Sequence, residues 1–147
     1  MDAEGKKIAI VFNQFYSELG ELYHQYAKNH DLSESAFWLL YALHEDGAAY
    51  TQSELCSDWH WTPQTVNSAL KNLERQGYIA LEPSPGNQKN KMIRLTQMGK
   101  ATVDEVIAPL VQAEEGAFAR FSRKEQTTLY QLTRKYIDSL RKGLTQL

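Results

Sequence analysis

The stretch TPQTVNSALKNLERQG, Thr62 to Gly77, has an ordinary apolar stripe and an unusual polar side. Its apolar residues recur at helical spacing and are Val66, Ala69, Leu70 and Leu73. This spacing predicts an amphipathic helix with one face turned to a core. The other face carries amides and hydroxyls beside two basic residues, although Asn, Ser and Thr each cost up to about 0.7 kcal/mol in a helix interior relative to Ala. Such side chains on an uncovered face call for a functional explanation.

The charge of the chain is unevenly distributed around this helix. The net charge of −2 over 147 residues by itself argues against a nucleic-acid binder. However, residues 1–58 carry a net charge of −7, residues 59–100 carry +4 and residues 101–147 carry +1. The quoted helix therefore lies in a basic segment of an acidic protein, a pattern that favours contact with nucleic acid.

Length and composition indicate a folded cytoplasmic protein of one domain. The chain has 147 residues, of which 42% are hydrophobic and 23% charged, and both fractions are ordinary for a soluble domain. We expect no membrane span, because no apolar run approaches about 20 residues. The N-terminal sequence MDAEGKK lacks the pattern of a signal peptide. The single cysteine, Cys56, excludes an internal disulfide and fits a reducing compartment.

Local signals before the quoted stretch predict three helices. Helical periodicity over about residues 6–29 predicts a long first helix. Ser33 is the expected N-cap of a second helix, which should stop near Asp46-Gly47 because glycine favours a left-handed helix end. The sequence Thr51-Gln52-Ser53-Glu54 is a capping box that opens a short third helix ending by Asp58.

After a turn at Trp59-His60-Trp61, the quoted helix should begin with Thr62 as N-cap and end at Gly77. Two strand-like runs follow, YIALEP from Tyr78 and KMIRLT from Lys91. The segment SPGNQKN joins them and contains a Pro-Gly turn signal.

The remainder of the chain is predicted to be helical. Thr96 is the expected N-cap of a long helix that Pro109 should kink. Ser122-Arg123-Lys124-Glu125 is a second capping box and opens a final helix.

A short helix, a tight turn and a longer helix form the helix-turn-helix arrangement, whose second helix lies in the DNA major groove. Amides can read adenine edges, hydroxyls serve as donors or acceptors, and Lys or Arg meets guanine or phosphate. The hairpin adds a wing whose basic tip could reach the minor groove or its phosphates. An ordinary solvated face would explain the same residues, but the hairpin and the local charge favour DNA. The predicted DNA-binding residues are Thr62, Gln64, Thr65, Asn67, Ser68, Lys71, Arg75, Asn87, Lys89 and Lys91.

The chain resembles the MarR family of bacterial winged helix-turn-helix regulators over essentially its whole length. The resemblance is carried by TQSELCSDWHWTPQTVNSALKNLERQGYI, residues 51–79, and by MIRLTQMGK, residues 92–100. The first stretch ends with the family's Leu-Glu-x-x-Gly pattern at residues 73–77. The second contains its Leu-Thr-x-x-Gly entry to the fifth helix at residues 95–99.

The resemblance implies a mainly α fold with a small β-hairpin wing, in which long dimerisation helices flank a winged helix-turn-helix. We expect one domain over residues 1–147. Residues 33–96 would form the DNA-binding part, and residues 1–32 and 97–147 the helical dimerisation part. The implied function is that of a homodimeric, sequence-specific DNA-binding transcriptional repressor released by a small aromatic or phenolic effector. Tyr16, Trp38 and Tyr41 are candidates to line the effector pocket, with core packing as the alternative role for each.

The sequence departs from the family pattern near the wing and the turn. Asn87-Gln88-Lys89 stands where relatives usually carry Asp-x-Arg, so the wing keeps its positive charge and loses the planar guanidinium fork. His60 stands where many such turns have Gly, which predicts a left-handed conformation for it. Trp59 and Trp61 occupy positions where aliphatic residues are usual, and we expect them to anchor the core.

No catalytic site, metal site or cofactor is predicted. The four histidines lack metal-ligand spacing, no nucleophile and base form a motif, and no glycine-rich phosphate loop is present. Cys56 is expected to be a small buried hydrophobe. The chain should therefore not be an enzyme. The alternative function is a dimeric protein-interaction module with a winged-helix fold that has lost DNA binding, which the acidic net charge and the altered wing would favour.

Overall fold

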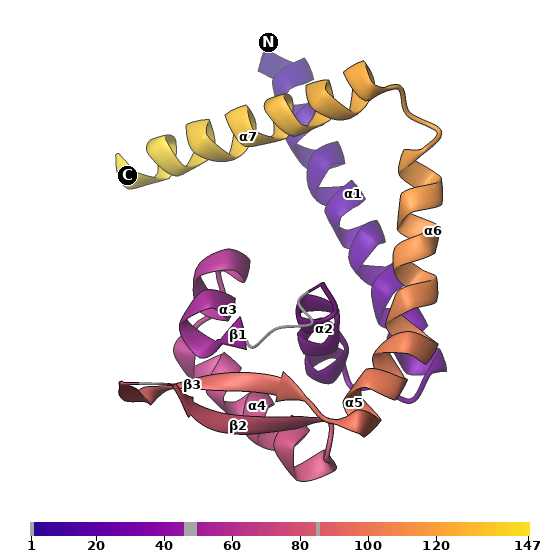
Figure 1. The fold of residues 1–147 in the computed structure, drawn as a ribbon. Coiled ribbons are helices and arrows are strands. Elements are labelled where there is room, and N and C mark those ends of the chain that lie inside the picture. Colours follow the sequence, from indigo (N-terminus) through magenta and orange to yellow (C-terminus); the bar gives the residue numbers. More distant parts are fainter. Residues whose placement is uncertain (1, 46–49, 85) are drawn as a thin grey trace. The chain divides into compact units, whose positions relative to one another are not determined.

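The computed structural model describes residues 2–45, 50–84 and 86–147 (Figure 1). The chain divides into two compact units, Met1–Ile107 and Ala108–Leu147, and each is described by itself. Unit 1 contains α1 (Asp2–Asn29), α2 (Glu34–Leu43), β1 (Tyr50–Thr51), α3 (Gln52–Trp59), α4 (Pro63–Gln76), β2 (Ile79–Ser84), β3 (Asn87–Leu95), α5 (Gln97–Thr102) and η1 (Val103–Ile107). Unit 2 contains α6 (Ala108–Phe118) and α7 (Arg123–Thr145). The mainly helical fold with a small antiparallel sheet confirms the predicted fold class.

Predicted helix starts are confirmed by their caps. The side chains of Ser33, Thr51, Thr62, Thr96 and Ser122 each accept a hydrogen bond from the backbone N–H three residues later. Both predicted capping boxes are complete. The predicted end of the second helix was wrong, because α2 ends at Leu43 and His44 is its C-cap in a right-handed conformation. Asp46 and Gly47 lie outside the described residues.

The three strands form one antiparallel sheet in the order β1-β3-β2. Tyr50 pairs with Ile93, and Ile79 pairs with Leu95. The predicted start of the second hairpin strand at Lys91 was wrong, because β3 begins at Asn87, which pairs with Ser84. Backbone hydrogen bonds hold two strands together whatever their side chains are, so polar residues can extend a strand. A prediction from alternating apolar residues alone therefore underestimates the length of β3. The two-residue β1 was not predicted, since it is too short to show a period.

The core of unit 1 is formed by the inner faces of α2, α3 and α4 together with the sheet and η1. Its most deeply buried large side chains include Phe37, Leu40, Leu55, Leu70, Ile93 and Ile107. Each such side chain contributes roughly 1.5–3 kcal/mol by leaving water. This core fixes α4 against α2, α3 and β2, and so decides which face of α4 stays uncovered.

The predicted long helix after Thr96 is interrupted before Pro109. A π-helical segment, η1, separates α5 from α6 and ends two residues ahead of the proline. Pro109 has no N–H to donate to the carbonyl four residues earlier, which disfavours a regular α-helix there. The Tyr26 hydroxyl donates to the Val106 carbonyl oxygen at 2.6 Å, and burial raises the pKa of Tyr26. A π-helical turn thus precedes the proline, and Tyr26 of α1 donates a hydrogen bond to the backbone of that turn.

Two helices carry large apolar side chains that the chain leaves exposed. On α1 they include Ile8, Phe15, Tyr16, Leu19 and Leu22. On α7 they include Leu129, Tyr130, Leu132, Leu140 and Leu144. In the described part of the chain, no helix is long and apolar enough to span a membrane.

Candidate nucleic-acid interface

The turn between α3 and α4 is short and contains one left-handed residue. His60 has φ 56° and ψ 36°, which confirms the conformation predicted for it. A residue with a side chain adopts this conformation at a cost of about 1–2 kcal/mol. Gln52 Nε2, at the start of α3, donates to the Pro63 carbonyl oxygen at 3.4 Å. The turn and this hydrogen bond place the start of α4 beside the start of α3.

The faces of α4 are divided as the sequence predicts. Its apolar stripe is 1–8% exposed and consists of Val66, Ala69, Leu70 and Leu73. Its polar residues remain exposed and include Gln64, Thr65, Asn67, Ser68, Lys71 and Arg75. Six of the ten residues predicted to bind DNA therefore share one helix and are open to solvent. Their contact with DNA stays a prediction.

Thr62 and Thr65 form a local hydrogen-bonded pair at the start of α4. Thr62 Oγ1 accepts from the Thr65 backbone N–H at 3.2 Å, and the Thr62 hydroxyl donates to Thr65 Oγ1 at 2.8 Å. Thr62 therefore caps the helix and orients the Thr65 hydroxyl. A DNA contact by Thr62 would have to share these bonds.

The wing is the hairpin of β2 and β3. Lys91 lies on β3 with an exposed side chain. Asn87 and Lys89 also belong to β3, but their side chains lie outside the described ones. Arg94 is a further exposed basic residue of the wing that was not predicted from the sequence. Its Nε lies 2.7 Å from Glu82 Oε2 in an exposed ion pair. Alternation with the buried Ile93 could have predicted its outward position.

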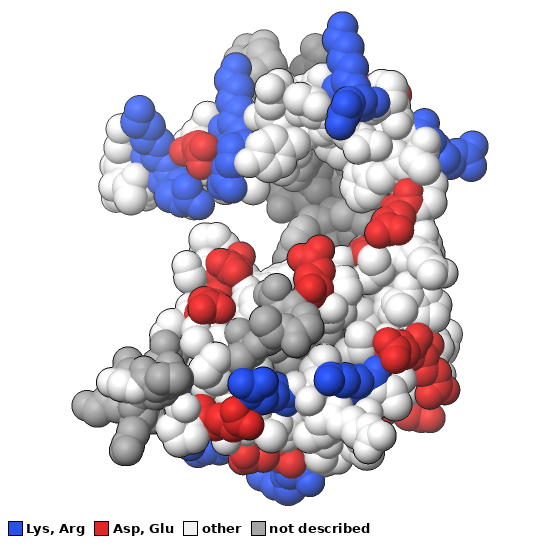
Figure 2. Space-filling model, viewed as in Figure 1, with Lys and Arg blue, Asp and Glu red and all other residues white. Residues whose placement is uncertain are grey.

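Basic and acidic side chains are not evenly mixed on unit 1. On the face shown in Figure 2, acidic side chains lie over α3, whereas basic side chains lie over the sheet and at the lower end of α4 beside a few acidic ones. This distribution agrees with the positive charge of residues 59–100. An approaching polyanion would be attracted to the sheet and α4 and repelled from α3.

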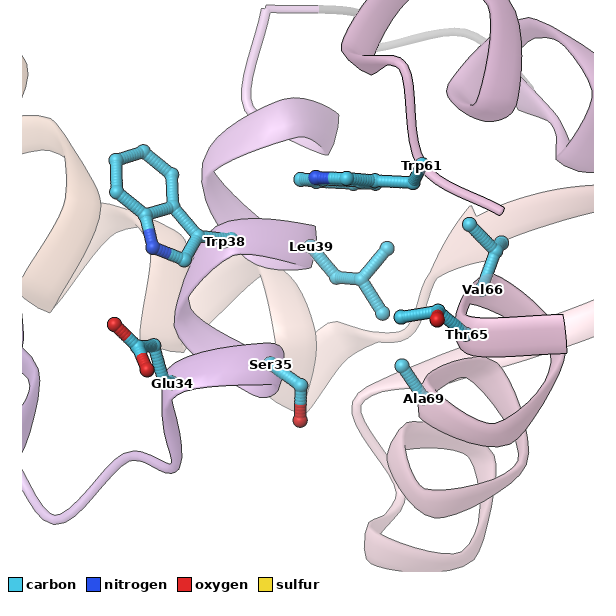
Figure 3. A pocket seen from close by; sticks show the side chains of 8 residues that line it. All are labelled: Glu34, Ser35, Trp38, Leu39, Trp61, Thr65, Val66 and Ala69. Carbon is cyan, nitrogen blue, oxygen red and sulfur yellow. The ribbon is translucent and has the colours of Figure 1, made fainter. Parts of the chain in front are cut away.

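The residues predicted to line an effector pocket are distributed over α1 and α2, and a shared pocket stays a prediction. Trp38 and Tyr41 lie on α2 with ring centroids 5.5 Å apart, and each lines a different cavity. A cavity of about 230 Å³ lies between α2 and α4 and is shown in Figure 3. The second, of about 490 Å³, lies between α2, β1 and α3. Tyr16 lines neither cavity and is 76% exposed on α1.

Two tryptophans and the cysteine are less buried than the sequence suggests. Trp59 and Trp61 were expected in the core, but both are half-buried and stack on each other with centroids 5.3 Å apart. Their large rings extend from the end of α3 and the following turn, where the surface is only partly covered. Cys56 is likewise half-buried rather than buried. Among the described residues, no group of three or more His, Cys, Asp or Glu could hold a metal ion.

The helix-turn-helix, the three-stranded sheet and the hairpin after α4 define a winged-helix protein. A family model described as MarR family matches residues 30–89. The transcriptional repressor NicR of Pseudomonas putida is 25% identical over 134 residues, which cover 91% of this chain and 84% of NicR. Residues 30–89 thus match the MarR family, and the comparisons support a MarR-type winged-helix regulator, a class whose members are transcriptional regulators and not enzymes.

Solved structures agree with this assignment. A MarR family regulator from Neisseria meningitidis is 25% identical, with a TM-score of 0.72, covering 99% of this chain and 96% of that one. The DNA complex of S. aureus MepR has the same fold, with a TM-score of 0.72 and 22% identity, and the match covers 90% of this chain and 97% of that one.

Proposed function

We propose that this chain is a homodimeric, sequence-specific DNA-binding transcriptional repressor that a small aromatic or phenolic effector releases from DNA. The observation that carries the proposal is the exposed face of α4, where amides and hydroxyls stand beside Lys71 and Arg75 on the second helix of a helix-turn-helix. NicR is named a repressor, and MepR is described in complex with DNA.

Within this proposal the residues of α4 divide into two roles. Gln64, Thr65, Asn67 and Ser68 lie near the N-terminal end, where recognition helices contact base edges. Lys71 and Arg75 lie further along and suit phosphates. On the wing, Lys91 and, by sequence, Asn87 and Lys89 add contacts to the DNA backbone, which strengthen binding without reading sequence.

The exposed apolar faces of α1 and α7 support a homodimer. Monomeric proteins rarely expose apolar patches larger than a few hundred Å², so a row of exposed Phe, Tyr, Ile and Leu side chains indicates an interface. A twofold dimer would present two copies of α4 to half-sites about one turn of DNA, roughly 10 bp, apart on a pseudo-palindrome.

The test is DNA binding measured by fluorescence anisotropy on duplexes from the region upstream of the protein's own gene. Scrambled duplexes of equal length and composition are the control. We expect a preference of at least about 1000-fold for one upstream duplex, as for specific regulators. Light scattering should show a dimer of the 16.8 kDa chain at micromolar concentration. A stable dimer with equal, weak affinity for all duplexes would favour a protein-interaction module instead.

A further inference from the structure

The cavity between α2 and α4 has the shape and lining of a small-molecule site. Its apolar part is formed by Leu39 of α2, by Val66 and Ala69 of α4 and by the Trp61 ring, which Figure 3 shows lying across Leu39. A cavity of about 150 Å³ accommodates benzene. The 230 Å³ of this cavity therefore leave room for one aromatic ring with a short substituent.

The polar groups of the cavity favour a cation over an anion. Among the described residues that line it, Glu34 is the only one with a charged side chain, and Ser35 and Thr65 supply hydroxyls. Figure 3 shows Glu34 and Trp38 at one edge of the cavity, where both project from α2 on the side away from Leu39, Trp61 and Val66. An ammonium group beside a carboxylate and an indole face gains both ionic and cation–π attraction. An anionic ligand would face the Glu34 carboxylate without a lining Lys or Arg to balance it.

We propose that this cavity binds a small aromatic amine, with its ring against the apolar lining and its ammonium group turned toward the edge that Glu34 and Trp38 form. Identifying the amine as the effector rests on the proposed function, but its binding to the cavity does not. The amine would touch Thr65, Val66 and Ala69 of α4, and Thr65 is one of the residues proposed to meet DNA. Occupancy of the cavity and DNA binding would therefore influence each other, and by linkage the two effects must be equal in size.

The chain contains its own optical probe for this site. Its three tryptophans are Trp38, Trp59 and Trp61, two of which line the cavity while the third stacks on Trp61. Tryptophan fluorescence of the full-length protein without DNA should change on titration with 2-phenylethylamine, and calorimetry should give the same Kd. The uncharged 2-phenylethanol should bind more weakly, and the anion 3-phenylpropanoate more weakly still.

Two variants locate the binding. Glu34→Gln should weaken binding of the amine about 1.5- to 5-fold, as expected for loss of an exposed ion pair, and leave binding of the alcohol unchanged. Glu45→Gln is the matched control, because Glu45 lies beyond the other end of α2 and lines the second cavity. Ala69→Leu should fill the cavity and weaken binding of all three probes at least about tenfold, while far-UV circular dichroism confirms that the variant is folded.

The outcomes separate the two proposals. Equal affinity for the amine and 3-phenylpropanoate, no binding by either method, or full binding by both Glu34→Gln and Ala69→Leu would overturn the cavity assignment. If Ala69→Leu fails to fold, the charge preference and Glu34→Gln still decide. Amine binding with the expected preference but without any effect on DNA affinity would keep the cavity and remove its role as the effector site. Absence of specific DNA binding would overturn the proposed function alone.

Discussion

Replacing Asn67 by alanine should move protein stability and DNA affinity in opposite directions. Asn67 is exposed on α4, and within the described part of the chain its side chain has no hydrogen-bond partner. Alanine is a better helix former than asparagine by up to about 0.7 kcal/mol, so Asn67→Ala should slightly raise the free energy of unfolding. If Asn67 reads an adenine edge, the same change should cost roughly 1–3 kcal/mol on the operator, about 5- to 150-fold in Kd.

Asn72→Ala is the matched control on the same helix. It makes the same chemical change at an exposed position, so it should give a similar gain in stability. Five residues further along, its side chain points about 140° away from that of Asn67 around the helix axis. We expect Asn72→Ala to change operator affinity by less than about 0.5 kcal/mol.

The assay is binding of both variants to operator and scrambled duplexes, with thermal unfolding measured in parallel. Asn67→Ala should lose affinity for the operator and little for scrambled DNA, because a base contact contributes to discrimination. Equal losses on both duplexes would make Asn67 a backbone contact. Unchanged operator binding with the expected gain in stability would show that the polar face of α4 near Asn67 does not read DNA.

Three further results are expected. Lys91→Ala should weaken binding to operator and scrambled duplexes alike and lower the slope of log affinity against log salt by about 1, and an unchanged slope would exclude a phosphate contact. Gly99→Ala should lower the free energy of unfolding by about 2–4 kcal/mol in denaturant titrations, because the added Cβ would lie 2.0 Å from the Tyr78 carbonyl oxygen, and a near-neutral change would refute that crowding. Burial raises the pKa of Tyr26, so the folded protein holds the Tyr26 proton more tightly than the unfolded chain, and the free energy of unfolding should fall as pH rises above about 10. Unfolding measurements on Tyr26→Phe should show a smaller fall at high pH and about 1 kcal/mol less stability at neutral pH.

The helix-turn-helix could be predicted from sequence because its determinants are local. The capping box at Thr51 and Glu54, the Thr62–Pro63 start and the glycine end at Gly77 each act within a few residues. The apolar stripe of α4 then fixed which face would be buried, and the exposed polar face followed from it.

The features that escaped prediction depend on contacts distant in sequence. β1 exists because Tyr50 and Thr51 pair with Ile93 and Met92, and two residues alone carry no strand signal. The cavity between α2 and α4 needs Trp61 and Leu39 to meet across the fold, which periodicity within either helix cannot show.

The placement of the tryptophans also bears on cooperativity. All three lie in unit 1, whereas residues 108–147 of unit 2 contain none, although α6 and α7 are helical. Tryptophan emission therefore follows the melting of unit 1 alone, while far-UV circular dichroism follows helices of both units. Coincident transitions by the two methods would show that the chain unfolds as one cooperative body, and a separate dichroism step would show that residues 108–147 melt independently.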